Sequence, residues 1–434
     1  MLYEISEKAK KEISAYCDNY EIYLEREELL ELDAQKTNLN FAKEEITIGV
    51  GIRVINNNKL GFAYTSDINQ IDKTAKQAFL NSKLNEEDKY LEFGDNIKST
   101  PIKDTFDKDY KNFTLEEGSE FLENMITTVE DEKCEVTSGG FSAGFGEQLI
   151  INSNGLSSYD KSTGYGAYIA VNAIDNGELS TSYDSLGSCK FDLNGEELSR
   201  NVCKIAKDSI GGENIQTQDT DVILDYHGAS GLLSNLINGL NGENVVRKRS
   251  ILHDKLGEEI LNPRLSIYDD NTYKGGLNSG AFDGEGTPAQ KTTLVKNGVL
   301  ENFIFDIYTG NKADTKSTGN GYRSASTTPS ISSSNVIFDY TEKIDIDEIE
   351  SGVLVTDVLG AHTANPITGD FSVEANNAFK IENGELTKPV KKAMISGNIY
   401  ESLKNSKAVN SKIKQVGSFI IPKIFISNLR VVGQ

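Results

Sequence analysis

The sequence predicts an α+β protein with an N-terminal α/β domain over residues 1–215 and a mainly antiparallel β domain with a central helix over residues 216–434. Three observations support this class. Helical and strand periodicities alternate through the first half, and the composition shifts near Gly211–Asn214. Beyond one apolar helix, strand and turn signals dominate the second half. The length of 434 residues also exceeds that of a usual single domain, about 100–200 residues.

The first half opens with a helix, because apolar residues recur at helical spacing over residues 1–17. Apolar and polar residues then alternate from Tyr20, which is typical of a half-buried strand. The clearest strand is Ile46–Val54, with five apolar residues at period two. The turn residues Asn56–Asn58 lead into another strand, and Asp67 is a helix-capping residue before an apolar helical face.

The same order of elements then recurs. A helix is expected at residues 115–131, strands from Cys134 to near Asn172, and a closing helix around Val202. The residue identities do not repeat, but the order of helix, strands and helix does. We therefore predict an internal duplication within the N-terminal domain.

In the second half, a buried strand at Asp221–Asp225 precedes a helix with leucines on one face from Leu232 to Leu240. The turns Lys296–Gly298 and Glu382–Gly384 lie between alternating runs and predict hairpins. Further strands are expected at Val353–Val358, at Phe419–Ile421 and at Ile424–Ile426, the last two divided by Pro422.

Charge and composition exclude several classes of protein. The formal net charge of −22 argues against nucleic acid as a direct partner, because phosphate binding needs clustered Lys and Arg. The N-terminus lacks the pattern of a signal peptide, and no apolar run reaches the ~18 residues of a membrane span. Four scattered cysteines without metal-ligand spacing indicate reduced, buried thiols. We expect a cytoplasmic protein.

Residues for hydrolytic chemistry are sparse. The three histidines are His227, His253 and His362, and none has a second histidine or an adjacent glutamate at the spacing of a helical zinc site. Gly228–Gly231 is not a serine nucleophile motif, because no residue separates Ser230 from the second glycine. The sequence therefore predicts no catalytic residue and no metal ligand in this chain.

Two glycine-rich segments, Asp283–Pro288 and Ser317–Arg323, have the glycine density of loops whose backbone approaches a ligand. They match no phosphate-binding fingerprint. They are typical either of β-turns in an antiparallel sheet, which we favour, or of a groove that lines a peptide. Arg323 is the most specific candidate, since a guanidinium can bind a peptide carboxylate with two hydrogen bonds.

Eight short segments, taken together and in order, resemble the TldD/PmbA family over nearly the whole chain. They are Gly51–Val54, Gly61–Asp67, Glu285–Pro288, Ser317–Asn320, Leu354–Asp357, Thr368–Ser372, Ile381–Glu385 and Ser396–Asn398. The family was long labelled as modulators of DNA gyrase and is now regarded as metallopeptidases.

The resemblance implies one of two kinds of subunit. The TldD kind carries HExxxH on a central helix and a cysteine near the C-terminus, which together hold zinc. The PmbA or TldE kind has a similar fold without them. Here the corresponding helix is Ala229–Leu236, which contains no ligand, and no cysteine follows Cys203. The chain thus resembles the TldE kind, with no cofactor of its own and with zinc expected in a partner subunit.

That resemblance implies a heterodimer with an HExxxH-bearing TldD-type subunit, enclosing a cavity for extended peptides that bind along a strand edge. The substrate-binding candidates are Glu285, Gly286, Thr318, Gly319, Asn320, Arg323, Asn365, Thr368, Gly369 and Asp370. A homodimer of the isolated chain is left open.

Two alternatives remain at this point. The first is a self-sufficient hydrolase that uses His227 or His362 with a serine or a carboxylate. The second is a regulatory binding protein without a peptidase role, whose acidity mimics nucleic acid at a basic partner.

Overall fold

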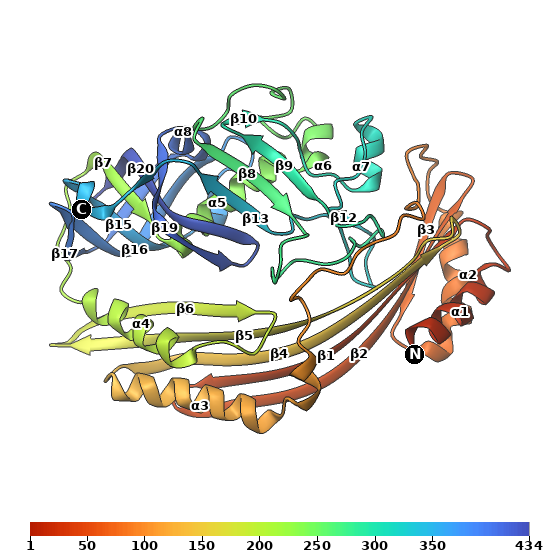
Figure 1. Cartoon of the computed structure of the whole chain (residues 1–434), viewed down its shortest axis with the longest axis horizontal. Coiled ribbons are helices and arrows are strands. Elements are labelled where there is room, and N and C mark those ends of the chain that lie inside the picture. The colour runs from red at the N-terminus through yellow and green to blue at the C-terminus, as the bar shows by residue number, and fades with distance from the viewer. Residues whose placement is uncertain (434) are drawn as a thin grey trace.

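The computed structural model describes residues 1–433, which build two large β-sheets with helices against them (Figure 1). The N-terminal sheet is antiparallel, in the order β3-β2-β1-β4-β5-β6. Its strands are β1 (Tyr20–Gln35), β2 (Asn38–Asn56), β3 (Lys59–Thr65), β4 (Glu135–Asn152), β5 (Ser157–Asp175) and β6 (Glu178–Ser188).

Each half of this sheet consists of a helix, three strands and a helix, the order that the duplication hypothesis predicts. The two halves meet where β1 pairs with β4. The helical elements are α1 (Leu2–Ile13), η1 (Ile68–Gln70), α2 (Ile71–Ser82), η2 (Lys108–Asn112), α3 (Leu115–Asp131) and α4 (Gly195–Asp208). α3 has the bounds predicted from the sequence, and Thr114 and Glu117 form a capping box at its start.

Both helix pairs lie on one face of the N-terminal sheet. Leu24 packs in the core under α1 and α2, and Leu32 packs in the core under α3 and α4. The two residues are eight apart on β1, so their side chains point to the same face. The opposite face is turned toward the C-terminal domain, where it contributes to the site described below.

One strand differs from the sequence prediction. The last strand of the N-terminal domain is β6, which lies beyond the end expected near Asn172. Its segment from Ser180 to Ser185 contains mostly polar residues, because β6 is the edge strand of the sheet and lacks a fully buried face. Apolar alternation is therefore too weak there to reveal it.

The C-terminal sheet has twelve strands, with the main order β10-β9-β8-β13-β20-β18-β16-β15-β7 and with β14, β17 and β19 paired beside it. Its strands, together with the two-stranded sheet of β11 and β12, are β7 (Gln218–Leu224), β8 (Leu265–Asp270), β9 (Lys291–Lys296), β10 (Val299–Leu300), β11 (Gly321–Tyr322), β12 (Ser330–Ile331), β13 (Val336–Tyr340), β14 (Lys343–Ile344), β15 (Ser351–Leu359), β16 (Asp370–Glu382), β17 (Glu385–Val390), β18 (Ala393–Asn398), β19 (Ser406–Val416) and β20 (Phe419–Val432).

Helices of this half are short apart from one. They are α5 (Tyr226–Leu240), α6 (Gly242–Val246), α7 (Ile307–Lys312), α8 (Ile399–Lys404), η3 (Ile346–Glu348) and η4 (Ala361–Thr363). Both predicted hairpins are confirmed: β9 pairs with β10 and β16 with β17. The central Asn and Gly of each turn have positive φ, 48° and 81° at Asn297 and Gly298, which explains the residue choice.

The prediction of two strands divided by Pro422 is wrong. β20 is one strand from Phe419 to Val432 and continues through the proline. Pro422 lies opposite Ile413, beside a register shift in the pairing with β19. The strand can continue there because the pairing is already irregular at the residue that has no N–H to donate.

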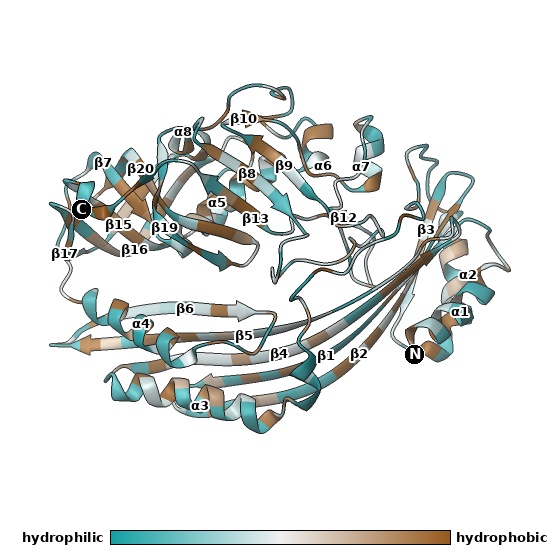
Figure 2. Ribbon diagram, in the orientation of Figure 1, coloured by the Kyte–Doolittle hydropathy of each residue, from teal (hydrophilic) through white to brown (hydrophobic). Residues whose placement is uncertain are grey.

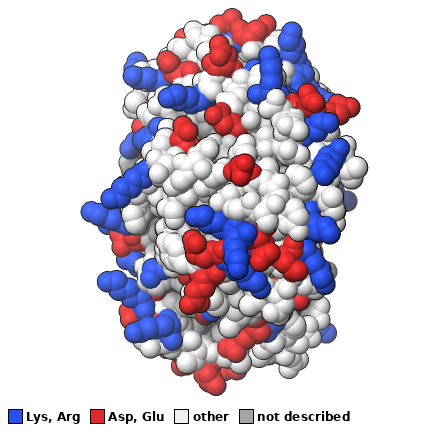
Figure 3. All heavy atoms as spheres, turned by 90° about the vertical axis from the view of Figure 1, so that its right-hand side faces the viewer, with Lys and Arg blue, Asp and Glu red and all other residues white. Residues whose placement is uncertain are grey.

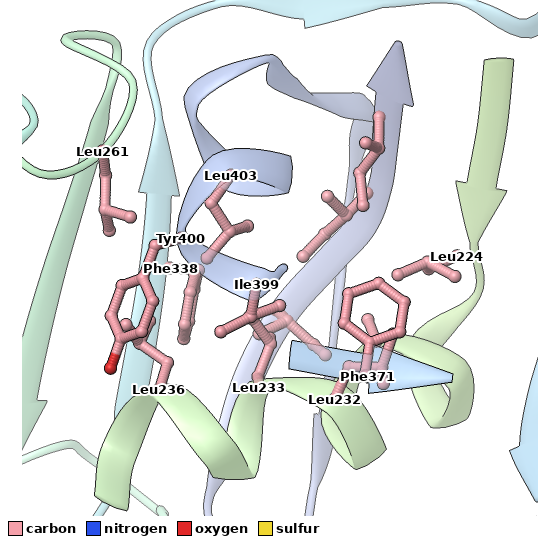
Figure 4. Packing of buried hydrophobic residues seen from close by; sticks show 14 of the residues in the cluster. Leu224, Leu232, Leu233, Leu236, Leu261, Phe338, Phe371, Ile399, Tyr400 and Leu403 are labelled. Atoms are coloured by element: carbon pink, nitrogen blue, oxygen red, sulfur yellow. The ribbon is translucent and has the colours of Figure 1, made fainter. Parts of the chain in front are cut away.

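The C-terminal core centres on α5. Its residues Leu232, Leu233 and Leu236 pack against Ile399 and other apolar side chains from α8 and the sheet (Figure 4). All three leucines are at most 1% exposed. Hydrophobic and hydrophilic residues alternate along the strands of both sheets (Figure 2), as half-buried strands require.

The face over α1, α2 and β3 carries Lys and Arg interspersed with Asp and Glu (Figure 3). It shows no continuous basic patch of the kind that nucleic acid binding needs. Across residues 1–433, no helix is long and apolar enough to cross a membrane.

Candidate functional site

A cleft of about 470 Å³ opens where the inner face of the N-terminal sheet meets the glycine-rich loops of the C-terminal domain. Tyr23 of β1 and Gln148 of β4 form one wall, and the Tyr23 hydroxyl donates to Gln148 Oε1 at 2.8 Å. The other walls come from Asn271 and residues 277–280, 282–284, 319–323 and 332–334. Both glycine-rich segments of the sequence therefore line the same cleft.

The glycines in these loops allow close backbone packing. The Gly284 N–H donates to the Gly321 carbonyl oxygen at 2.5 Å, and a Cβ at Gly321 would lie 2.7 Å from Glu285 Oε2. Gly286 and Gly319 have φ of 81° and 74°, which side chains disfavour. The loops thus use their glycines for turns and close contacts as well as for lining the cleft.

Asp283 holds the two loops together. Its Oδ1 accepts the N–H groups of Glu285 and Thr287, both at 2.9 Å, and its Oδ2 accepts the Gly321 N–H at 2.8 Å. Burial raises the pKa of this carboxyl above its ordinary value, although the three N–H donors oppose that rise. Sequence reasoning singled out the segment but not this residue.

A buried cluster of four ionisable residues joins the two domains. Glu21 of β1 accepts from Arg53 Nε at 2.8 Å and from Arg323 Nη1 at 2.5 Å, through the same Oε1 atom. Arg53 Nη2 lies 3.8 Å from Glu285 Oε1. The four side chains are at most 7% exposed. Arg53 and Glu21 belong to the N-terminal sheet, whereas Arg323 and Glu285 belong to the C-terminal loops.

Arg323 faces the N-terminal sheet. Its guanidinium lies 4.6 Å from the ring centre of Tyr23, and its side chain has no exposed surface. Nη1 binds Glu21, while Nε and Nη2 have no hydrogen-bond partner among the described residues. The residue is thus positioned to join the domains at the cleft floor, and its contact with a substrate carboxylate stays a prediction.

The segment after Arg323 packs directly on β2. The Ala325 N–H donates to Glu25 Oε1 at 2.9 Å. A Cβ at Gly49 would lie 2.5 Å from Ala325 Cβ, and one at Gly51 would lie 2.5 Å from the Ala325 carbonyl oxygen. These two glycines are therefore required for the close approach of the domains.

Of the other candidates in these two loops, Gly319 and Asn320 line the cleft, whereas Glu285, Gly286 and Thr318 are not among its lining residues. The Thr318 hydroxyl donates to Asn320 Oδ1 at 2.6 Å, and Asn320 Nδ2 donates to Asp269 Oδ1 at 2.8 Å. The Gly319 carbonyl accepts from Asn271 at 2.9 Å. Glu285 Oε2 accepts the N–H of Ile307 at 2.8 Å, and burial raises the pKa of Glu285.

The predicted residues near position 370 lie elsewhere. Asn365 Oδ1 accepts the Thr368 N–H at 3.2 Å, and the Thr368 hydroxyl donates to Asp370 Oδ2 at 2.7 Å. Gly369 has a φ of 81° and lies against the ring of Tyr400. None of these loop residues is among those that line the cleft within residues 1–433. The structure therefore separates the ten candidates into two groups.

The start of α5 faces β6 of the N-terminal domain. His227 Nε2 lies 2.5 Å from Asp184 Oδ1, and Lys414 Nζ contacts the same carboxylate at 2.8 and 2.9 Å. These contacts lower the pKa of Asp184 although burial opposes them. Sequence reasoning found His227 but had no signal for Asp184 or Lys414, which lie far away in the chain.

The other two histidines do not join this group. His253 Nδ1 lies 3.0 Å from the Ser250 carbonyl oxygen, and His362 belongs to η4. In the described part of the chain, no three His, Cys, Asp or Glu side chains lie where they could hold a metal ion. The Ser230 hydroxyl donates to the His227 carbonyl oxygen at 3.0 Å, so it is not directed to the imidazole.

Three family models match the chain in order. Residues 20–82 match PmbA/TldA metallopeptidase domain 1, residues 108–210 the central domain and residues 217–433 the C-terminal domain. The chain belongs to the PmbA/TldD metallopeptidase family. The predicted resemblance is thereby confirmed.

Relatives of this family differ in their similarity to the chain. An uncharacterized protein of Methanocaldococcus jannaschii is 37% identical over 87% of this chain and 88% of its own length. Metalloprotease PmbA of Escherichia coli O157:H7 is 27% identical over 70% of this chain and 66% of its own length. The crystal structure of TldE from Thermococcus kodakarensis covers 99% of this chain and 100% of its own, with a TM-score of 0.92 at 24% identity, which shows the fold.

In this PmbA/TldD family member, contacts between the domains join candidates from the sequence, Arg323 and Glu285, to residues that sequence reasoning did not single out. Arg53 lies in one of the eight segments that carry the family resemblance. Its partner Glu21 lies outside all of them. Strand alternation could have found Glu21, because it points to the face opposite its apolar neighbours Tyr20 and Ile22. Strand alternation does not show which residues Glu21 contacts.

Proposed function

We propose that this chain is a TldE/PmbA-type subunit without a catalytic zinc site. It pairs with an HExxxH-bearing TldD-type subunit in a zinc metallopeptidase that degrades or processes unfolded peptides. The membership in a metallopeptidase family and the TldE-like fold support this proposal.

The observation that carries it is the start of α5, where His227 is followed by Gly228 and is bound to Asp184. Lys414 places an ammonium group at the carboxylate that contacts this imidazole. This ammonium group would repel a zinc ion at the same carboxylate. Zinc also requires three or four N, O or S ligands. The residues present do not fit a zinc ion, so catalysis is assigned to the partner subunit.

Under this proposal the chain contributes binding surface. The cleft between the domains has backbone groups of glycine-rich loops on one side and Tyr23 and Gln148 on the other. An extended peptide held mainly by hydrogen bonds to backbone groups is bound with little sequence selectivity. The substrate class is therefore an unfolded peptide, and access restricted to extended chains would protect folded proteins.

Reconstitution tests the assignment. The chain alone, a TldD-type subunit alone and an equimolar mixture are assayed on an unfolded peptide with zinc present. We expect the chain alone to be inactive and the mixture to be more active than the TldD-type subunit. Peptide hydrolysis by the chain alone would contradict the proposal.

The alternative of a self-sufficient hydrolase rests on the His227–Asp184 contact. The substitution His227→Gln distinguishes the self-sufficient hydrolase from the proposed heterodimer. A hydrolase that uses this imidazole loses its activity with the substitution, whereas the proposed complex keeps its activity if the variant still folds. Stable binding to a DNA gyrase subunit without pairing to any TldD-type subunit would instead support the regulatory alternative.

A further inference from the structure

The face of the N-terminal sheet that is turned toward the C-terminal domain carries a row of carboxylates on β1 (Figure 1). Glu25 marks this face, since its Oε1 accepts the N–H of Ala325 at 2.9 Å. Alternate residues of a strand share a face, so the next residues on this side are Glu27, Leu29, Glu31 and Asp33. All of them except the leucine carry a carboxylate.

The carboxylates of this row are not neutralised by neighbouring cations. Glu27 and Glu31 are exposed, and neither has an ion-pair partner within residues 1–433. Lys43 of β2 lies opposite Glu31, but its ammonium group contacts Glu45. The other face of β1 differs, because Arg26 contacts two carboxylates there. The row thus leaves a net negative charge on the face toward the C-terminal domain.

Beside the carboxylate row, the same face of the sheet has almost no side chains. On β4, Gly146 lies opposite Glu27 and Gly144 lies opposite Leu29, and on β5 Gly164 lies opposite Gly144. A Cβ at Gly164 would meet no atom within 4 Å, and one at Gly146 would meet only a serine Oγ at 3.9 Å. A Cβ at Gly144 would meet only atoms of the same sheet. Open space therefore lies above these three glycines.

These glycines form the floor of a trough, and the carboxylate row forms one wall. Glycine inside a strand costs stability, and it often marks a place where a ligand or another backbone approaches closely. Tyr23 and Gln148 lie next along β1 and β4 on the same face and line the cleft, so the trough leads out of the cleft. At its other end the Tyr168 ring lies over Gly140, and the Tyr168 hydroxyl donates to Asp33 at 2.7 Å.

We propose that this trough binds the part of an extended peptide that lies beyond the cleft, and that it favours peptides with lysine or arginine at alternate positions. Alternate side chains are about 6.6 Å apart both on β1 and in an extended peptide, so every second peptide residue can face one position of the row. The inference rests on the proposed function, because it names a class of peptide for the same site. Backbone contacts in the cleft give little selectivity, and the carboxylates of the trough add a preference for positive charge.

The first test is the Kd of the full chain for three unfolded peptides, measured by fluorescence anisotropy at low ionic strength. The peptides are identical except that every second residue is lysine, glutamine or glutamate. We expect the lysine peptide to bind about 10-fold more tightly than the glutamine peptide, because several exposed ion pairs each add a small favourable contribution. The glutamate peptide should bind least tightly, and added salt should reduce the differences.

Two double variants separate the trough from the overall negative charge of the chain. Glu27→Gln/Glu31→Gln removes the exposed carboxylates of the row and should reduce the preference for lysine to about 3-fold or less. Glu120→Gln/Glu123→Gln removes the same charge from exposed positions of α3, on the opposite face of the sheet. This control should keep the full preference, although its net charge changes equally.

The second test fills the trough. Gly164→Tyr places a large side chain in the open space and should weaken binding of the lysine peptide about 10-fold. Its stability should not fall, because tyrosine is favoured in strands and meets no clash at its Cβ. Asn124→Tyr, at an exposed position of α3, is the matched control and should bind as the starting chain does.

Equal binding of the lysine and glutamine peptides would overturn the inference and leave the proposed peptide-binding role in place. An equal loss of preference in the two double variants would also overturn it, since net charge alone would then explain the preference. Unchanged binding by Gly164→Tyr would place the peptide outside the trough. Binding of none of the three peptides would contradict both the inference and the binding role proposed for the chain.

Discussion

Removing the carboxylate of Glu21 should destabilise the chain more than any other single change in the charge cluster. Glu21 Oε1 is shared by Arg53 at 2.8 Å and by Arg323 at 2.5 Å, and its side chain has no exposed surface. Glu21→Gln leaves two buried guanidinium groups beside a neutral amide. Loss of one member of a buried ion pair costs about 3–5 kcal/mol, so we expect the free energy of unfolding to fall by that amount.

Arg323→Met is the matched comparison. It removes one guanidinium, but Glu21 keeps its contact with Arg53, and the unbranched methionine still packs on the ring of Tyr23. We expect a loss of about 1.5–3 kcal/mol, the usual range for a hydrogen bond to a charged group. The difference between the two variants thus reports on the sharing of one carboxylate oxygen.

The chain has no tryptophan, so urea unfolding is followed by far-UV circular dichroism. Limited proteolysis of the connection between α4 and β7 reports separately on domain docking. An unfolding free energy of Glu21→Gln within about 1 kcal/mol of the starting chain would refute the reasoning. So would a larger loss in Arg323→Met than in Glu21→Gln.

Three further predictions concern the interface and the core. Gly51→Ala places a Cβ 2.5 Å from the Ala325 carbonyl oxygen and should lower the free energy of urea unfolding by about 1–3 kcal/mol. Gly164→Ala, which has open space around it, is the neutral control. Equal losses in the two variants would contradict this prediction. Leu236→Ala in the fully buried core should cost about 2–5 kcal/mol by thermal unfolding, and a loss below that range would mean that the core collapses around the gap. Burial raises the pKa of Glu285 from its ordinary 4.5 to about 8. The unfolded chain therefore releases this proton at lower pH than the folded chain, and the free energy of unfolding should fall as the pH rises from 4.5 to about 8. Glu285→Gln should flatten that dependence, and parallel pH curves for the two proteins would exclude Glu285 as its source.

Local patterns were sufficient for much of the fold. α3 was predicted with its observed bounds because apolar residues recur there at helical spacing. The Asn-Gly turns were found because a positive φ restricts the residue choice. β6 was missed because an edge strand needs no apolar alternation, and β20 was divided because a proline usually ends regular pairing.

The site was harder to predict, since its contacts join distant parts of the chain. Sequence reasoning identified Arg323 and Glu285 as unusual, but strand periodicity carries no information about the partner of a charged residue. Glu21 lies 302 residues before Arg323, and Asp184 lies 230 residues before Lys414. Such pairs follow from the docking of the domains, which local patterns do not specify.

The most direct test of the central claim is the zinc content of the chain, purified alone under non-chelating conditions and measured by elemental analysis. We predict no stoichiometric zinc, because no three His, Cys, Asp or Glu side chains of the described residues lie where they could hold a metal ion, and Lys414 occupies the carboxylate beside His227. A TldD-type subunit purified in the same way is the positive control. One zinc per chain, lost on changing His227 to Gln, would contradict the assignment of catalysis to the partner subunit.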